Sequence, residues 1–417
     1  IVGSNRDYWR AWLASHERHL HGLSPEHAAL YRRSLLCLRA HVDGGGGVLA
    51  SLDSDMLRYA FDTYGYVWPR DAAFAALALD EAGDTGVSKR FFEFARATVS
   101  EDGFFWHKYL PDASRGSSWH PFIQDGRRQL PIQEDETALV LYALCKHFRR
   151  TRDLEFIESV YEPLIEKSAD FLNQYRDLET RLPLPSYDLW ERQRGCFTFT
   201  AASVCGALTE AADISKILGK QAHHEHYKTA AEEVRSAILA HLWDEGRGIF
   251  LKGRADAQAG AAPDATIDMS SAYGVWRFGV LPEGDSRLSR AFAASVRALS
   301  RGVMQGGIAR FEGDDYYRDA PEAAGNPWII TTLWYAEYLT SIAQGDAGLS
   351  RVREIFDWAL RHALPTGALP EQIHAQTGAP LSATPLAWSH AAYVSAILRY
   401  LDKMEELGLC PKCRDAR

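Results

Sequence analysis

The sequence predicts an all-α fold, an (α/α)6 barrel in which six inner helices are surrounded by six outer helices. Six segments are apolar on almost every side and rich in small residues, and amphipathic segments with charged faces alternate with them. A helix that is apolar all round has to be buried, whereas an amphipathic helix can expose one side to water. The apolar segments begin at intervals of roughly 60–70 residues, which indicates an internal repeat. Buried helices that alternate with half-exposed ones in this way predict two concentric rings.

The inner helices are expected at residues 71–80, 136–145, 199–208, 268–276, 328–338 and 386–398. The outer helices are expected at residues 88–99, 154–175, 224–242, 287–299 and 349–362, with the helical segments 5–20 and 25–41 as a flank and the sixth outer helix. A stacked array of helix pairs is the alternative, but its repeats usually have roughly 20–45 residues. The longer repeat favours one barrel domain over residues 1–417, in which about the first 45 residues form leading helices.

Composition limits the classes to which the protein can belong. The chain has 417 residues, 46% apolar and 24% charged, as in ordinary globular proteins. Its formal net charge is −9 and it has no long basic run, so nucleic acid is not an expected partner. No stretch approaches roughly 18 uninterrupted apolar residues, so a membrane span is not expected. Aromatic residues make up 12%, and their rings can either fill a core or stack on the faces of a sugar.

The six cysteines are scattered along the chain and do not form a disulfide framework. Cys410 and Cys413 form a CxxC pair, but no second pair or nearby His completes a set of zinc ligands. We therefore expect neither a metal nor an organic cofactor, and a cytoplasmic location fits this cysteine usage. The chain begins at Ile1 without Met or a signal-peptide pattern, which indicates that a preceding segment is missing.

The loops that lead into the inner helices contain the candidate site residues. In a barrel of this kind the six loops open on one face, where side chains from distant segments meet. The candidates, in chain order, are Tyr66, Arg70, Asp71, Trp119, Trp190, Glu191, Arg192, Arg310, Trp328 and Glu371. Carboxylates, arginines and indole rings that converge on one mouth predict a ligand site.

Two of these residues supply the pair of carboxyl groups that glycosidic cleavage requires. One carboxyl group must be protonated to donate to the leaving oxygen, and the other must be ionised to activate water or attack the sugar. Glu191 follows Trp190 in an aromatic, Leu-rich stretch, which predicts a raised pKa and the role of the acid. Glu371 is followed by Gln372 and His374, a more hydrated setting that suits the base.

Each residue alone also has an ordinary structural explanation. A Glu before a helix is most often a first-turn residue that the helix dipole favours. Arg70 beside Asp71 can be a structural ion pair, and Trp328 can belong to the barrel core. The context of the motifs, rather than any one residue, favours a functional site.

Taken together, the motifs resemble the glucoamylase family, glycoside hydrolase family fifteen. The resemblance extends over nearly the whole chain and rests on these segments, in order: YGYVWPRDAAFAALALD, GSSWHP, PIQEDETALVLYAL, LPSYDLWE, FTFTAASVCGAL, GNPWIITTLWYAEYL and LPEQIHAQTGAPLSATPLAWSHAAYVSAIL. It implies an (α/α)6 barrel and an inverting hydrolase that releases β-D-glucose from the non-reducing ends of α-glucans. The spelling is most similar to that of bacterial and archaeal intracellular members, which often have an N-terminal β-sandwich domain that this chain lacks.

The resemblance also implies a role for each matched residue. Glu191 in DLWE matches the general acid, and Glu371 in LPEQ matches the general base. Arg70 and Asp71 in WPRD, together with Arg310, resemble the groups that hold the terminal glucose. The pocket aromatics are matched by Trp119, Trp190 and Trp328, and the floor of the pocket by Trp388.

Arg192 departs from the family pattern. Many relatives have a second Glu after the acid, in contact with the leaving-group sugar, whereas here Arg192 is followed by Gln193 and Arg194. The preference among α-1,4, α-1,6 and other linkages, trehalose included, is therefore open. An inverting phosphorylase and a decayed, non-catalytic sugar-binding domain are further alternatives. Glu371 argues against the first, and the presence of both carboxylates argues against the second. No oligomeric state is predicted.

Overall fold

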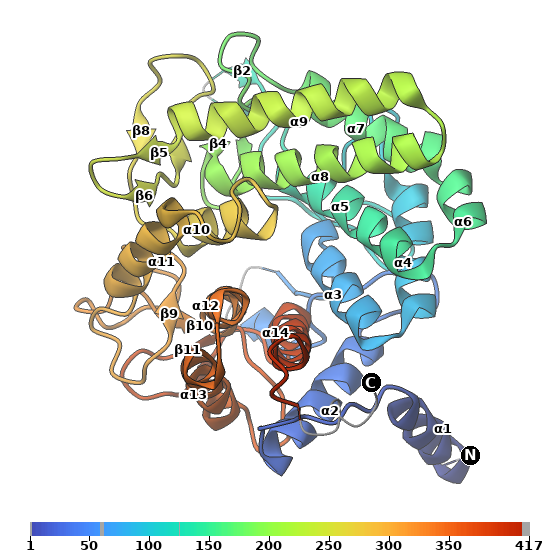
Figure 1. Cartoon of the computed structure of the whole chain (residues 1–417), viewed down its shortest axis with the longest axis vertical. Coiled ribbons are helices and arrows are strands. Elements are labelled where there is room, and N and C mark those ends of the chain that lie inside the picture. The colour runs from blue at the N-terminus through green and yellow to red at the C-terminus, as the bar shows by residue number, and fades with distance from the viewer. Residues whose placement is uncertain (1, 59–61, 125, 411–417) are drawn as a thin grey trace.

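A computed structural model describes residues 2–58, 62–124 and 126–410 of the chain (Figure 1). Cys413, the second cysteine of the CxxC pair, lies outside the described residues. Cys410 is buried, with its Sγ 3.0 Å from Nε2 of His21.

Six helices form an inner ring: α3 (Pro69–Ala82), α5 (Glu134–Thr151), α8 (Thr198–Ile217), α10 (Met269–Arg277), α12 (Ile329–Ile342) and α14 (Ala387–Glu406). Each packs against the next one along the chain, and α14 packs against α3, so the ring is closed. Most of their residues are buried, as the apolar segments predicted. Small residues such as the alanines of α3 let neighbouring helices approach closely.

Six helices form the outer ring: α2 (Pro25–Ala40), α4 (Thr85–Thr98), α7 (Lys167–Gln174), α9 (Gln221–His241), α11 (Ser286–Leu299) and α13 (Asp346–His362). From α4 onward, each packs on the inner helix that precedes it, and α2 packs on α14. The N-terminal part of the chain thereby completes the ring that the last helix closes. The predicted (α/α)6 barrel is confirmed. The flanking helix α1 (Val2–Ser15), expected at residues 5–20, projects from the two rings in Figure 1.

The outer segment predicted as one helix over residues 154–175 is divided into three pieces. A π-helical turn (Tyr161–Glu166) separates α6 (Leu154–Ser159) from α7. Pro163 lies inside this turn. Proline lacks the backbone N–H and its ring clashes with the preceding turn, which accounts for the break.

Short antiparallel strands join the loops at the end of the barrel where the inner helices begin. One sheet has the order β12-β11-β10-β9, formed by Pro380–Leu381, Gln372–Ile373, Pro327–Trp328 and Ile308–Ala309. A second sheet has the order β3-β4-β7-β8, formed by Ser186–Tyr187, Arg194–Phe197, Gly253–Arg254 and Pro263–Asp264. Two hairpins, β1-β2 (Ile123–Gln124, Arg127–Arg128) and β5-β6 (Trp243–Asp244, Ile249–Phe250), and a 3-10 helix (Ser54–Arg58) complete the described elements. The strands fix the loops of the third and sixth inner helices, which contain the two candidate carboxylates.

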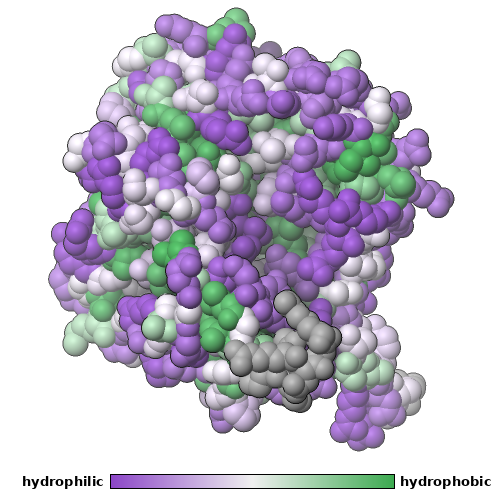
Figure 2. Space-filling view, in the orientation of Figure 1, coloured by the Kyte–Doolittle hydropathy of each residue, from purple (hydrophilic) through white to green (hydrophobic). Residues whose placement is uncertain are grey.

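An aromatic cluster fills the axis of the barrel. Trp334 on α12 is 1% exposed, and its ring centroid lies 4.2 Å from that of Tyr273 and 5.8 Å from that of Trp388. Phe74, Phe199 and Trp190 also contact the Trp334 ring. The barrel is therefore packed along its axis rather than open as a channel. The face shown in Figure 2 is largely hydrophilic, with hydrophobic residues in small separate groups. No helix in the described part of the chain is long and apolar enough to cross a membrane.

Candidate active site

A cavity of about 640 Å³ lies at the end of the barrel where the inner helices begin. Pockets that enclose drug-sized ligands have volumes of roughly 300–1,000 Å³. Nine of the predicted residues line this cavity: Arg70, Asp71, Trp119, Trp190, Glu191, Arg192, Arg310, Trp328 and Glu371. The remaining lining residues are mostly apolar or aromatic: Ala50, Asp62, Thr63, Tyr64, Trp68, Leu189, Tyr316, Tyr317, Leu386 and Trp388.

Tyr66 is the predicted residue that does not line the cavity. Its ring lies over the ammonium group of Lys108, at 4.3 Å, and its hydroxyl is 3.4 Å from Oδ1 of Asp62. Tyr64 lines the wall instead, and its hydroxyl is 3.1 Å from that of Tyr316. The backbone bends at both tyrosines. The sequence motif does not show which of the two side chains such a bend directs into the cavity.

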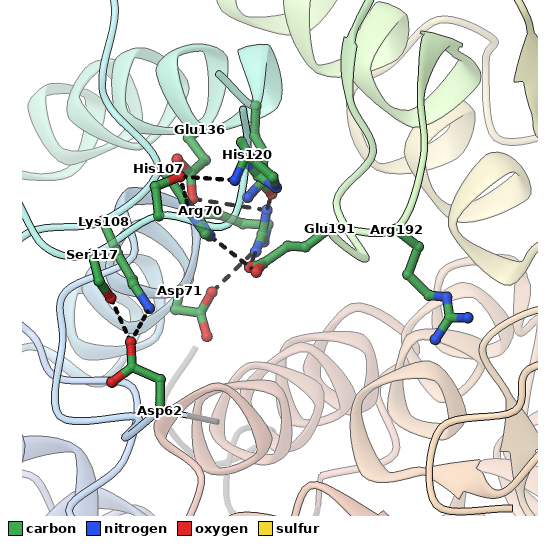
Figure 3. Close-up of polar contacts among 12 residues, drawn as sticks. Asp62, Arg70, Asp71, His107, Lys108, Ser117, His120, Glu136, Glu191 and Arg192 are labelled. Atoms are coloured by element: carbon green, nitrogen blue, oxygen red, sulfur yellow. Dashed lines mark hydrogen bonds and ion pairs between the residues drawn. The ribbon is translucent and has the colours of Figure 1, made fainter. Parts of the chain in front are cut away.

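Glu191 lies between two nitrogen donors from other elements (Figure 3). Its Oε1 accepts a hydrogen bond from Nη2 of Arg70 at 3.2 Å, and its Oε2 is 3.0 Å from Nε2 of His107. Arg70 is in the first turn of α3, and His107 is in the irregular loop between α4 and α5. Figure 3 shows Arg192 pointing in the opposite direction, away from this cluster.

A tight turn presents Glu191 to the cavity. Glu191 has a φ of 64°, in the left-handed region that residues other than glycine seldom adopt. Its N–H donates to the carbonyl oxygen of Asp188 at 2.8 Å, and Oδ1 of Asp188 accepts from the N–H groups of Arg192 and Gln193 at 2.7 and 3.0 Å. Lys252 contacts the other oxygen of this carboxylate at 3.1 Å. An unfavourable backbone conformation persists where the surroundings fix it, as these bonds do here.

The electrostatic environment of Glu191 is not the one predicted. Burial acts to raise its pKa, but the charge and hydrogen bond of His107 and the charge of Arg70 outweigh burial and lower the pKa below its ordinary value. The raised pKa inferred from the neighbouring Trp190 is therefore wrong. Arg70 and His107 are 121 and 84 residues away from Glu191 in sequence, so local context does not indicate their effect.

Glu371 has the opposite environment. The residue is 5% exposed, and burial raises the pKa of its carboxyl group to about 7, although Ser382 and Arg310 oppose the shift. The hydrated setting inferred from Gln372 and His374 is wrong, because Gln372 is fully buried in β11. Among the described residues, Oε2 of Glu371 has no hydrogen-bond partner although it is buried. This oxygen is thus available to a bound water or hydroxyl group.

Arg70 is a buried cation that faces four carboxylates. Besides Glu191, it lies 3.6 Å from Asp71, 3.3 Å from Asp135 and 3.9 Å from Glu136. Burial raises the pKa of Asp71 to about 7 and that of Asp135 to about 6, with Arg70 opposing both shifts. One guanidinium cannot compensate four buried negative charges, so part of this cluster is protonated near neutral pH.

Arg310 and the indole rings form another part of the wall. The carboxylate of Asp314 accepts two hydrogen bonds from Arg310, at 2.7 and 2.8 Å, which fix the guanidinium. The guanidinium lies 4.2 Å from the ring centroid of Trp328 and 5.2 Å from that of Trp190. Trp190 is itself fixed by a hydrogen bond from Nε1 to Asp268, at 2.8 Å.

The rim of the cavity is more exposed and more polar. Arg192 is half-exposed and pairs with Asp315 at 2.7 Å. Trp119, 49% exposed, lies over the ammonium group of Lys108 at 4.1 Å. Lys108 also contacts the carboxylate of Asp62 at 3.1 Å, and Ser117 donates to the same carboxylate (Figure 3).

Several buried polar atoms of the wall lack partners in the described part of the chain. They include the indole N–H groups of Trp68, Trp328 and Trp388. An unpaired buried donor costs roughly 1–3 kcal/mol, and such groups at a cavity are satisfied by a ligand rich in oxygen atoms. A polyhydroxylated ligand fits this wall.

One cluster of the described residues has ligand atoms close enough for a metal ion: His107, His120 and Glu191, within 4.8 Å of one another. The rings of His107 and His120 stack at 4.2 Å with an interplanar angle of 22°. Imidazole nitrogens bind a metal in the plane of the ring, so stacked rings direct their lone pairs side by side rather than toward one ion. The geometry suits a hydrogen-bonded carboxylate better than a metal centre.

Comparison with known proteins identifies the family of the chain. A family model for glycosyl hydrolases family 15 matches residues 125–398. The chain is 29% identical to an uncharacterized glycosyl hydrolase of Methanocaldococcus jannaschii, over 94% of this chain and 60% of that protein. It is 23% identical to trehalase 2 of Sulfolobus acidocaldarius, over 89% of this chain and 63% of that protein. The chain thus spans about three fifths of the length of these two relatives. The isomaltose glucohydrolase of Kribbella flavida is 24% identical, over 92% of this chain and 93% of that protein.

Solved structures show the same fold. A wild-type glycosidase superimposes with a TM-score of 0.70 at 24% identity, over 94% of this chain and all of that one. A bacterial glucoamylase complexed with acarbose superimposes with a TM-score of 0.72 at 20% identity, over 90% of this chain and 56% of that one. The family match covers most of the chain and agrees with its closed double ring of helices, and the chain belongs to glycosyl hydrolase family 15.

Proposed function

We propose that the chain is an exo-acting, inverting glycoside hydrolase that releases β-D-glucose from the non-reducing ends of α-glucans or maltooligosaccharides. One observation carries the proposal: Glu191 and Glu371, from the entrances of the third and sixth inner helices, line the same cavity. Two carboxyl groups that flank one bond are what glycosidic cleavage requires.

In the proposed reaction, Glu191 donates its proton to the glycosidic oxygen as the bond from that oxygen to the anomeric carbon breaks. A water oxygen attacks the anomeric carbon from the opposite face, and Glu371 takes the proton that this water loses. Attack from that face inverts the configuration. Arg70, Asp71 and Arg310 bind hydroxyl groups of the terminal glucose, and the indole rings cover its faces.

The pKa values of the two carboxyl groups run opposite to these roles, and substrate binding acts against both shifts. Sugar hydroxyl groups that bind Arg70 compete with Glu191 for the N–H donors of the guanidinium. A sugar that excludes water further disfavours the ionised form of Glu191. The pKa of Glu191 therefore rises toward that of an acid. Positive charge that develops at the anomeric carbon favours the ionised form of Glu371, which makes it the base in the transition state.

Glu191→Gln and Glu371→Gln test both the activity and the direction of the roles. Maltose needs a proton on its leaving oxygen, whereas α-glucosyl fluoride has a leaving group that needs little help. We expect Glu191→Gln to lower kcat/KM for maltose by about 10²–10⁴-fold and to retain most activity on the fluoride. Glu371→Gln should lose activity on both substrates, because both need an activated water. Proton NMR of the wild-type reaction should show β-glucose first.

A reversed pattern, with fluoride hydrolysis lost in Glu191→Gln and kept in Glu371→Gln, would exchange the two roles. Wild-type protein that releases no glucose from any α-glucoside, or that releases the α-anomer, would overturn the proposed function.

The leaving-group linkage is the finer part of the proposal. Relatives named as glucoamylases, trehalases and an isomaltose glucohydrolase all match the chain at low identity. Assays with maltose, isomaltose, trehalose, maltooligosaccharides and dextran, with and without phosphate, should rank the linkages. Activity that requires phosphate would replace hydrolysis by phosphorolysis.

A further inference from the structure

His107 contacts Glu191 but lies outside the cavity wall and has no role in the proposed reaction. It is 2% exposed, and its Nε2 is 3.0 Å from Oε2 of Glu191. Arg70, the other donor to Glu191, is shared with Asp71, Asp135 and Glu136. Among the described residues that donate to Glu191, His107 is therefore the one whose donor is not shared with another carboxylate.

The hydrogen bonds of His107 favour one tautomer. Its Nδ1 is 3.0 Å from Oγ of Ser118, and the same Oγ accepts from the backbone N–H of His120 at 3.1 Å. The Ser118 hydroxyl hydrogen is then free to point at Nδ1. A His107 ring that accepts at Nδ1 and a doubly protonated ring that donates at Nδ1 both carry a proton on Nε2, where it is donated to Glu191.

The orientation of the His107 ring is fixed by a stack of rings that reaches the Glu191 turn. His107 stacks on His120 at 4.2 Å, and His120 stacks on Tyr187 at 3.8 Å with an interplanar angle of 3°. Tyr187 ends β3, four residues before Glu191 in the chain. The loop of His107 is therefore connected to the Glu191 turn in two ways, by the contact of His107 with Glu191 and by the stacked rings that end at Tyr187. Trp119 meets the His107 ring edge-on at 4.6 Å.

We propose that His107 is the positioning residue of the proton donor, which holds the Glu191 carboxyl group in the direction from which it protonates the leaving oxygen. This inference rests on the proposed function and adds a residue to it. A displacement of about 1 Å at a reacting group can cost about 10²-fold in rate. Cleavage that needs a proton should therefore depend on His107, and cleavage that needs none should not.

His107→Ala and His107→Gln test this dependence. The measured quantity is the ratio of kcat/KM for the best glucoside to kcat/KM for α-glucosyl fluoride. We expect His107→Ala to lower this ratio by about 10-fold or more. His107→Gln should restore it to within about 3-fold, because its amide nitrogen can donate from nearly the position of Nε2.

The pH profile gives a second readout. The charged and titratable groups around His107 come from its own loop, from α3, from α5 and from the turn before α8. They are Lys108, His120, Arg70, Asp71, Asp135, Glu136 and Glu191, and burial keeps His120 neutral by lowering its pKa to about 3. A donor to a carboxylate lowers the pKa of that group. The alkaline limb of glucoside hydrolysis is where Glu191 loses its proton. In His107→Ala this limb should move to higher pH, because the pKa of Glu191 rises.

His147→Ala is the matched control. His147 is also buried and its Nδ1 is 3.0 Å from the carboxylate of Asp80, but neither residue lines the active-site cavity. This variant should lose stability and leave the activity ratio unchanged. A ratio within about twofold of wild type in His107→Ala, or an equal fall in His147→Ala, overturns the role of His107.

The inference is separable from the proposed function. Wild-type protein inactive on every glucoside and on the fluoride overturns the function, whereas an unchanged ratio in active variants overturns only the role of His107. The contact itself is measured without turnover: Glu191→Gln should shift the His107 Nε2 signal in a ¹⁵N NMR spectrum. An unshifted signal would contradict the contact.

Discussion

At the scale of single residues, the two candidate carboxylates differ in how they contribute to stability. Burial raises the pKa of Glu371 to about 7, so its folded form binds a proton more tightly than its unfolded form. This contribution is present at low pH and is lost as the pH rises toward and beyond 7. The charges of His107 and Arg70 lower the pKa of Glu191 against the effect of burial. Its contribution is therefore present above the unfolded pKa and is lost as the pH falls.

These opposite signs predict opposite effects of the two amide substitutions on stability. At pH 8, Glu371→Gln should raise the free energy of unfolding by roughly 1–3 kcal/mol, because it removes a buried charge. At the same pH, Glu191→Gln should lower it, because it removes a charge that Arg70 and His107 stabilise. Denaturant unfolding at pH 5 and pH 8 measures both effects. The effect of Glu371→Gln should shrink at pH 5, whereas that of Glu191→Gln should persist there, because pH 5 still lies above the ordinary pKa of a Glu carboxyl group. Shifts of the same sign at pH 8 would contradict the two environments.

The raised pKa of Glu371 also predicts the acidic limb of the pH–activity profile. The base acts in its ionised form, so kcat/KM for α-glucosyl fluoride should rise with pH and level off above about 7, the pKa of the Glu371 carboxyl group. Stopped assays on α-glucosyl fluoride isolate this limb, because that substrate makes little demand on the acid. A flat profile between pH 5 and 8 would show that another group acts as the base.

Arg192 acts at the rim, where a leaving-group sugar would lie. Its pair with Asp315 is exposed to solvent, and exposed pairs contribute only about 0.2–1 kcal/mol. Arg192→Ala should therefore change the relative kcat/KM among maltose, isomaltose and trehalose by about 2- to 10-fold. Hydrolysis of α-glucosyl fluoride, which has no leaving-group sugar, should stay within about twofold. Asp315→Asn, which keeps Arg192 but breaks the pair, separates the effect of the guanidinium from that of the ion pair.

The limits of prediction from sequence are clearest at this scale. The motifs around Arg70, Glu191 and Glu371 were sufficient to find these residues, because each motif is a contiguous run. His107 was missed because a single His in an irregular loop has no pattern that distinguishes it. The pKa order was wrong for a related reason: the groups that determine it are distant in sequence and meet only in the fold.

At the scale of an element, the turn from Asp188 to Gln193 determines where Glu191 points. Asp188→Ala removes the acceptor of two backbone N–H groups and leaves the buried Lys252 without its nearest partner. We expect kcat to fall by about 10- to 100-fold and stability to fall by about 3–5 kcal/mol. Asp188→Asn keeps the Oδ1 acceptor and loses the ion pair. It should lose stability but keep most of kcat, measured per folded molecule. Full activity in Asp188→Ala would mean that the turn does not need this carboxylate.

Helices were predictable at this scale and short strands were not. The period of apolar residues in α3 or α5 extends over many positions and identifies a buried helix. Two-residue strands such as Gln372–Ile373 carry no period, and their pairing with Trp328 depends on a partner from another loop. The break in the outer helix around Pro163 had a visible cause in the sequence, yet its position as a π-helical turn depends on how the flanking pieces pack.

At the scale of the whole molecule, the barrel axis and the cavity share one aromatic cluster. Trp334 touches rings from α3, α8, α10 and α14 and also the ring of Trp190. Two of its neighbours, Trp190 and Trp388, line the cavity. The closure of the ring and the shape of the cavity floor therefore depend on the same side chain.

Replacement of Trp334 tests this dependence. Trp334→Ala should cost about 3–5 kcal/mol of unfolding free energy and leave a void into which Trp190 and Trp388 can shift, so that glucose affinity falls as well. Trp276→Ala is the matched control, because Trp276 packs on Phe292, Tyr338 and Tyr273 but neither contacts Trp190 or Trp388 nor lines the cavity. It should be similarly destabilised yet bind glucose as wild type does, as denaturant unfolding and titration calorimetry would measure. Trp334 contacts the rings of the neighbouring inner helices and also two rings that line the cavity. Its replacement should therefore lower both the free energy of unfolding and the glucose affinity. Equal loss of glucose affinity in both variants would mean that general destabilisation, and not the shared cluster, disturbs the cavity.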